Sequence, residues 1–247
     1  MNSLELEILE IVKVSFVSIF LIYACSLDIK SRVVPNRVWK AMLISVSPIL
    51  VLQLYHNITM DPLPLLFSVF GVLFMLILSY FIYTIGAYGG ADAKALMCLS
   101  VIFPLYPSID PFPILNHGFG IFSFSILANS VIFTPFMIFA ILLRNIFKEG
   151  FEGFFKNPLY YFAGYRISVE KIKFHNLFEF IDENGELRRV KRAIESDDNK
   201  LLLLKKAGIK EIWVTPALPF MIFITIGYFG ALIFGDILVE IISLIFG

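Results

Sequence analysis

Six stretches of mostly apolar residues, each near the length that crosses a lipid bilayer, constrain this sequence most. They cover residues 8–27, 38–55, 63–85, 91–105, 120–143 and 217–234, and the last can be extended to residue 246. A bilayer-spanning helix needs about 20 such residues, because the hydrocarbon core is about 30 Å thick. The fourth stretch is short, so it can span only if the bilayer thins or its start lies in a watery cavity. We predict an all-α polytopic membrane protein with about six transmembrane helices.

The composition supports a protein whose surface faces lipid. Of the 247 residues, 58% are hydrophobic and 16% are charged. Soluble domains average roughly 45–50% hydrophobic residues and about 25% charged residues. There are too few polar residues to cover a soluble core of this size. The net charge is zero, so no nucleic-acid partner is predicted. The two cysteines, Cys25 and Cys98, lack the spacing of a metal site, and we predict neither a metal nor a cofactor.

The basic residues predict the orientation in the membrane. If the N-terminus is outside and six spans alternate, all of the 20 Lys and Arg residues except Lys13 fall on the cytoplasmic side. The outer loops, at 56–62 and 106–119, then contain no basic residue. Because Lys and Arg concentrate in cytoplasmic loops, the sequence predicts a multi-pass protein of the plasma membrane with its N-terminus outside.

One long polar segment, residues 144–213, is predicted to form a small cytoplasmic domain between the fifth and sixth spans. Its start, 144–156, mixes Phe with Lys and Glu, which is typical of an amphipathic helix in the membrane interface. Asn184 and Gly185 lie between two short runs and predict a β-hairpin. We therefore expect three parts: 1–143 with five spans, 144–213 with β structure, and 214–247 with the last span.

Two acidic residues stand out because they lie at the ends of apolar stretches. Asp28 ends the first stretch, and Asp92 begins the fourth. In the predicted topology the first helix runs inward and the fourth runs outward, so both carboxylates lie at the same cytoplasmic depth. Ionisable residues in membrane spans are costly and usually mark a functional site. We expect Asp28 and Asp92 to meet in space.

A pair of adjacent carboxylates can hydrolyse a peptide bond. Two such groups tend to share one proton, so one can activate a water while the other donates to the peptide carbonyl. Glycines before Asp92 would let a substrate or a neighbouring helix approach closely. Structural roles are also open at this stage: Asp28 could pair with Lys30 or Arg32, and Asp92 could cap its helix.

These residues resemble a known family. The segment 89–94, Gly-Gly-Ala-Asp-Ala-Lys, resembles the G-x-G-D motif of membrane aspartyl proteases, and more narrowly that of type IV prepilin peptidases and archaeal preflagellin peptidases. The segment 28–36 resembles the family's first-aspartate region, which leads through basic residues to Pro-Asn. Residues 213–220 resemble the entry to the last helix in archaeal members. The resemblance extends over nearly the whole chain.

The resemblance implies a membrane aspartyl endopeptidase that cleaves the class III signal peptides of prepilins or preflagellins at the cytoplasmic face. The partners of such an enzyme would be those precursors and the lipid bilayer. The resemblance implies no oligomeric state. Lys30, Arg32 and Lys94 could steer an acidic group or tune the pair, or could only anchor the chain by charge. The implied site comprises catalytic Asp28 and Asp92 with supporting Gly89, Gly90, Ala91, Lys94, Lys30, Pro35 and Asn36.

The sequence departs from the family pattern in two places. Ala91 replaces the second glycine of the motif, which leaves the local backbone geometry open. The paired C-x-x-C motifs of many bacterial members are absent, since the chain has only 2 cysteines, so an additional N-methyltransferase activity is not expected. Two other functions remain open: a proton- or cation-coupled transporter, in which the aspartates bind the coupled ion, and a non-enzymatic membrane scaffold.

Overall fold

The structure, a computed structural model, describes residues 2–60, 62–182, 184–216 and 219–246. Glu183, in the predicted hairpin, and residues 217–218, where the sixth apolar stretch was predicted to begin, lie outside the described residues. The chain divides into two compact units. Unit 1 comprises Met1–Phe133 and Pro219–Gly247, and unit 2 comprises Thr134–Leu218.

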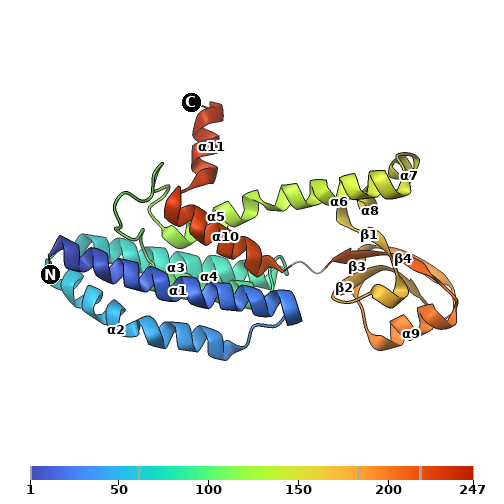
Figure 1. Ribbon diagram of the computed structural model, residues 1–247, viewed down its shortest axis with the longest axis horizontal. Coiled ribbons are helices and arrows are strands. Elements are labelled where there is room, and N and C mark those ends of the chain that lie inside the picture. Colours follow the sequence, from blue (N-terminus) through green and yellow to red (C-terminus); the bar gives the residue numbers. More distant parts are fainter. Residues whose placement is uncertain (1, 61, 183, 217–218, 247) are drawn as a thin grey trace. The chain divides into compact units, whose positions relative to one another are not determined.

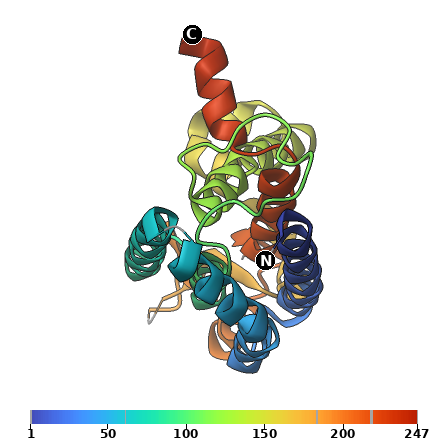
Figure 2. The same ribbon diagram turned by 90° about the vertical axis from the view of Figure 1, so that its left-hand side faces the viewer.

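Unit 1 is helical in all of its regular elements. The first four helices lie side by side in Figures 1 and 2, and α10 packs against α1, α4 and α5. The helices are α1 (Ser3–Ser31), α2 (Asn36–Met60), α3 (Pro62–Thr84), α4 (Gly90–Ile102), α5 (Phe122–Ile132), α10 (Phe220–Ile233) and α11 (Ile237–Phe246).

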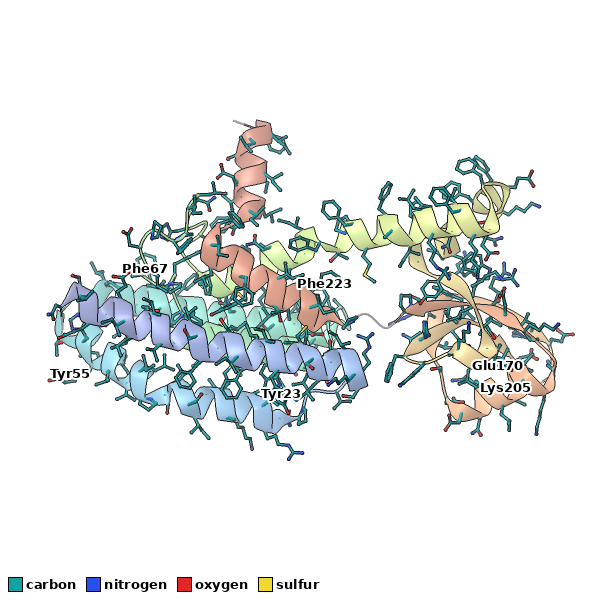
Figure 3. The ribbon with its side chains drawn as sticks, in the orientation of Figure 1. Tyr23, Tyr55, Phe67, Glu170, Lys205 and Phe223 are labelled. Atoms are coloured by element: carbon teal, nitrogen blue, oxygen red, sulfur yellow. The ribbon has the colours of Figure 1, made fainter. Side chains whose placement is uncertain are left out.

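The apolar residues of unit 1 both fill its core and cover its surface. Leu21, Leu96 and Tyr228 are fully buried in one cluster. Tyr55 and Phe67, in contrast, are 71% and 66% exposed and point outward in Figure 3. A helical unit that leaves its outer surface this apolar requires a lipid environment. The structure therefore confirms a mostly helical membrane protein.

Four described helical stretches are long and apolar enough to cross a bilayer. They are Ser3–Ser31, Asn36–Thr59, Leu63–Thr84 and Phe122–Glu149. The helix predicted at 91–105 is α4, and its 13 residues reach only about 20 Å at 1.5 Å per residue. The sixth apolar stretch contains two short helices, α10 and α11. Length and hydropathy thus support four of the six predicted spans.

A buried polar network breaks the last apolar stretch between α10 and α11. Gly235 adopts φ +92°, which ends α10. Asp236, which is fully buried, then begins α11 by accepting the Val239 N–H at 3.0 Å. Ser125 Oγ donates to the same carboxylate at 2.8 Å, and Asn129 Nδ2 donates to the Gly235 carbonyl at 2.9 Å. The break is therefore fixed to α5 by hydrogen bonds.

Unit 2 combines a small antiparallel sheet with helices. The sheet has the strand order β1-β4-β2-β3, so the β structure predicted after residue 144 is present. The elements are α6 (Thr134–Glu149), α7 (Glu152–Lys156), α8 (Pro158–Ala163), β1 (Tyr165–Ser168), the 3₁₀ helix Val169–Lys171, β2 (His175–Ile181), β3 (Leu187–Glu195), α9 (Asp198–Lys206) and β4 (Glu211–Pro216).

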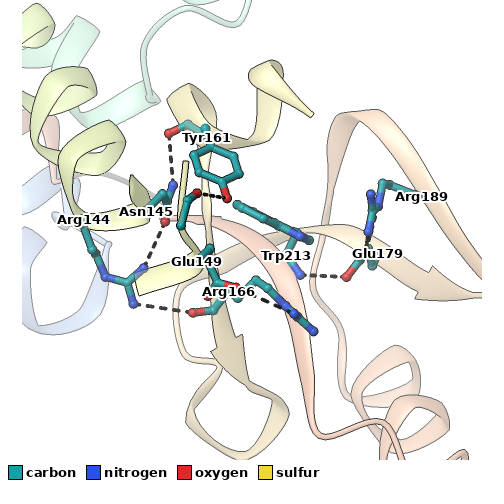
Figure 4. Close-up of polar contacts among 9 residues, drawn as sticks. Arg144, Asn145, Glu149, Tyr161, Arg166, Glu179, Arg189 and Trp213 are labelled. Atoms are coloured by element: carbon teal, nitrogen blue, oxygen red, sulfur yellow. Dashed lines mark hydrogen bonds and ion pairs between the residues drawn. The ribbon is translucent and has the colours of Figure 1, made fainter. Parts of the chain in front are cut away.

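A buried carboxylate connects three strands of this sheet (Figure 4). Glu179 on β2 is only 4% exposed. It accepts Arg189 Nε of β3 at 2.7 Å and the Trp213 N–H of β4 at 2.9 Å. The pairing of β2 with β4 ends at Leu177 and Val214, and beyond this point the Glu179 side chain serves as the acceptor for the Trp213 N–H. This carboxylate therefore fixes the centre of the sheet.

The β2–β3 connection is stabilised by Asp182. Its backbone N–H donates to the Glu186 carbonyl at 3.0 Å, and Gly185 adopts φ +80°. The Asp182 carboxylate accepts the Glu186 and Asn184 N–H groups at 2.9 and 3.0 Å. The hydrogen bonds from Glu186, together with those from Asn184 and the Arg188 charge, hold the pKa of Asp182 below its usual value.

This lowered pKa predicts a pH-dependent hairpin. Because the folded pKa lies below the unfolded one, ionised Asp182 stabilises the turn above the unfolded value of about 3.9. The contribution is lost as the pH falls through the folded pKa. Asp182→Asn should therefore speed amide exchange in the hairpin at pH 7, whereas parent and variant should converge as the pH falls below the folded pKa of Asp182. A difference that persists unchanged at low pH would contradict this.

Candidate active site

The buried face of α1 ends in an aspartate. Val17, Leu21, Ala24 and Asp28 recur every three or four residues and are all buried, which is the spacing of one helix face. Asp28 is 7% exposed. The face that packs α1 into the core therefore also points the carboxylate inward.

The first turn of α10 receives the Asp28 carboxylate. The Met221 backbone N–H donates to it, and Met221 is the second residue of α10. The first N–H groups of a helix have no partner within the helix, and the helix dipole favours a negative charge there. Arg32, whose backbone N–H donates to the Asp28 carbonyl at 3.0 Å, also interacts with the carboxylate charge. Asp28 thus lies where α1 ends and α10 begins.

Asp92 occupies an equivalent position at the start of α4. It is the third residue of this helix and is 7% exposed. Its Oδ2 accepts the backbone N–H of Gly89, the residue before the helix, at 3.1 Å. The structural role left open by the sequence is therefore present, because the carboxylate does cap its helix. A capping carboxylate keeps its other oxygen available for chemistry.

The two aspartates lie within range of each other's charge. The Asp28 charge acts on the Asp92 carboxylate, although 64 positions (28 to 92) separate the two residues along the chain. α10 contacts both α1, which carries Asp28, and α4, which carries Asp92, so it holds these two helices together. Two buried carboxylates, each accepting an N–H at a helix start, form the candidate site.

The predicted supporting residues lie in two groups. Lys94 Nζ donates to Asn36 Oδ1 at 2.8 Å, which connects α4 to the start of α2. Pro35 precedes α2, and its carbonyl accepts the Val38 N–H at 3.0 Å. Lys30 is exposed and lines a groove beside α10. Lys94, Asn36 and Pro35 therefore fix how α2 and α4 meet, whereas Lys30 belongs to a different surface.

Sequence reasoning missed the part of the site contributed by α10. The Met221 contact uses a backbone group, which no residue type reveals. Tyr88, next to the glycine motif, packs against Phe220 with ring centroids 4.2 Å apart and the rings tilted by 32°, and it interacts with the Asp92 charge. The one available signal was Pro219, which precedes the helix as its N-cap.

Gly89 and Gly90 are expected to differ in their tolerance of a methyl group. A Cβ on Gly89 would lie 3.0 Å from Asp92 Oδ2, whereas one on Gly90 would lie 3.6 Å from the Tyr83 ring, an ordinary contact. Gly89→Ala should displace the carboxylate and lower kcat/KM about tenfold, or about 1.4 kcal/mol. Gly90→Ala is the matched control, with less than about a threefold change. Equal rates for the two variants would contradict this account of Gly89.

Comparison with known proteins assigns both parts of the chain. Residues 15–148 match the type IV leader peptidase family, and residues 156–237 match the family described as archaeal peptidase A24 C-terminus type II. A preflagellin peptidase of Methanocaldococcus jannaschii is 30% identical over 240 residues, 93% of this chain and 97% of the relative. One of Methanococcus maripaludis is 29% identical over 222 residues, 87% and 92% of the two chains.

The family match spans the regions that carry both aspartates. It begins within α1 before Asp28 and continues past Asp92 to residue 148. A third relative, the preflagellin peptidase of Methanococcus voltae, is 25% identical over 227 residues, 90% of this chain and 94% of its own. The resemblance given by the short motifs at 28–36 and 89–94 is confirmed over nearly the full length. This chain belongs to the type IV leader peptidase family.

Proposed function

We propose that this chain is a membrane-embedded aspartyl endopeptidase that cleaves the class III signal peptides of prepilins or preflagellins at the cytoplasmic membrane face. The observation that carries the proposal is that Asp28 and Asp92 are both buried, that each accepts a backbone N–H at a helix start, and that they lie close enough for the Asp28 charge to act on Asp92. Family membership and the names of the relatives support a peptidase of this kind.

In this mechanism the two carboxylates share one proton. The ionised carboxylate takes a proton from a water, and the resulting oxygen nucleophile attacks the scissile carbonyl carbon. The protonated carboxylic acid donates to the carbonyl oxygen. The tetrahedral intermediate then collapses as the leaving nitrogen receives a proton, giving one carboxylic acid and one amine. The pair acts as a unit, so neither role is assigned to one residue.

The active site should open to the cytoplasm in a six-span arrangement. In this arrangement six segments cross the membrane: the four long helical stretches, α4 and the last apolar stretch. The N-terminus is outside. This arrangement would put every basic residue except Lys13 on the cytoplasmic side, as is usual for membrane proteins. The strands of unit 2, which include the basic strand β3, would lie in the cytoplasm. Exposed Phe147, Phe151 and Phe155 suit contact of α6 and α7 with the membrane interface.

The alternative of a proton- or cation-coupled transporter has no support from the family match or the relatives. The scaffold alternative likewise does not explain why two carboxylates are buried together, since an uncompensated pair of like charges destabilises a fold.

The test is a cleavage assay with the purified chain in proteoliposomes and a tagged precursor that carries a class III signal peptide. The expected result is a product shortened at the junction between the charged segment and the apolar helix. A matched precursor with a blocked junction should remain intact. If the protein moved protons or cations across the vesicle membrane and never cut the precursor, the proposal would fail.

A further inference from the structure

A groove of about 300 Å³ lies between α1 and α10. Most of its lining is apolar, and its α1 residues recur at the spacing of a single helix face. The lining comprises Ile22, Cys25, Ser26, Ile29 and Lys30 from α1, and Thr225 from α10. The proposed mechanism uses none of these side chains.

The groove adjoins the candidate catalytic aspartate. Cys25 lies three residues before Asp28 on α1, its thiol interacts with the Asp28 charge, and it hydrogen-bonds Thr225. Thr225 in turn donates its hydroxyl to the Met221 carbonyl at 2.7 Å. The Met221 N–H donates to the Asp28 carboxylate. The groove and the carboxylate therefore both lie where α1 contacts α10.

The surroundings of the groove specify what could occupy it. Ile22 and Ile29 are 57% and 50% exposed, and they lie in the candidate span Ser3–Ser31, so the groove opens toward lipid. Lys30, at the end of that span, places a positive charge at one end of the groove. An occupant should therefore be apolar over most of its length and polar at the end nearest Asp28.

We infer that this groove receives the apolar helix of the precursor and aligns the bond to be cut beside Asp28. The inference rests on the proposed function and adds the substrate-binding surface to it. Ridges of side chains on one helix pack into grooves between others, and the volume holds a few such side chains. The charged segment of the precursor would then continue past Lys30 into water.

Photocrosslinking tests the inference at single residues. A benzophenone amino acid at position 22 should capture the precursor in proteoliposomes of the full-length protein. The matched control is position 77, because Ile77 lies in another candidate span, Leu63–Thr84, and is 70% exposed but does not line the groove. At least fivefold more precursor adduct at position 22 than at 77 is expected. Equal capture, or capture of lipid alone at position 22, would overturn the inference.

Thiol protection gives a second measurement. In a Cys98→Ala protein, Cys25 is the only thiol, since the chain has 2 cysteines. A precursor with an uncleavable junction should slow alkylation of Cys25 by phenylmaleimide at least fivefold, and complete alkylation should raise KM for the cleavable precursor. Alkylation at one rate with and without precursor would mean that lipid fills the groove, and the inference would fail.

These results separate the inference from the proposed function. If the protein cuts the precursor but positions 22 and 25 do not respond to it, only the groove assignment is wrong. If no cleavage occurs at all, the proposed function itself fails.

Discussion

Replacing Asp28 or Asp92 by asparagine is expected to lower kcat/KM for a prepilin-like substrate at least about 1,000-fold, which corresponds to about 4 kcal/mol of lost transition-state stabilisation. Asparagine keeps the size of the side chain and one acceptor oxygen, so the hydrogen bonds from Met221 and Gly89 can remain. It cannot, however, take up a proton from water or share one with the remaining carboxylate.

The matched control for this prediction is Asp110→Asn. Asp110 is exposed and lies in the loop between α4 and α5, away from the ends of α1 and α4 that carry the pair. Its replacement should change kcat/KM by less than about twofold. All three variants should insert into membranes in equal amounts. Full activity of either the Asp28→Asn or the Asp92→Asn protein would refute the catalytic assignment.

The second large effect is expected in unit 2, where Glu179→Ala should open the sheet. The substitution leaves Arg189 and the Trp213 N–H without their shared acceptor. Breaking a buried ion pair costs about 3–5 kcal/mol, and we expect about 2 kcal/mol because the Arg189 side chain is 42% exposed. Amide exchange in β2 and β4 should therefore speed up about 30-fold at neutral pH.

Glu170→Ala serves as the control for this measurement, because Glu170 is exposed on the 3₁₀ helix Val169–Lys171 and labelled in Figure 3. It should leave exchange in β2 and β4 within about twofold of the parent. If the Glu179→Ala and Glu170→Ala proteins exchanged at the same rate, the proposed role of the buried carboxylate in the sheet would be excluded.

The parts of the fold that depend on residue type and spacing could be predicted from the sequence. Apolar length predicted the long helices of unit 1, and the position of Asp28 and Asp92 at the ends of apolar stretches led to the candidate site. The turn residues Asn184 and Gly185 indicated β structure in the polar segment, and the sheet is present. Each of these inferences needs only a local pattern and the thickness of a bilayer.

The remaining features depend on contacts that no local pattern encodes. Apolar length alone does not reveal the break after α10, although Gly235 and Asp236 are residue types typical of a helix end and a helix start. The hydrogen bonds from Ser125 and Asn129 that fix this break join segments far apart in the sequence. The Met221 contact with Asp28 uses a backbone N–H. Glu179 reaches the Trp213 N–H just beyond the last β2–β4 pair, Leu177 and Val214, and where that pairing ends depends on how the strands meet.

If the Asp28 and Asp92 carboxylates act as one catalytic unit, a comparison of the cleavage rates of single and double variants will reveal it. Residues that act as a unit have non-additive effects on rate. We expect the Asp28→Asn/Asp92→Asn protein to cleave the precursor within about tenfold of the rate of either single variant. A double variant slower than both single variants by a further factor of about 100 or more would show that the two carboxylates contribute independently, and the shared catalytic role would be excluded.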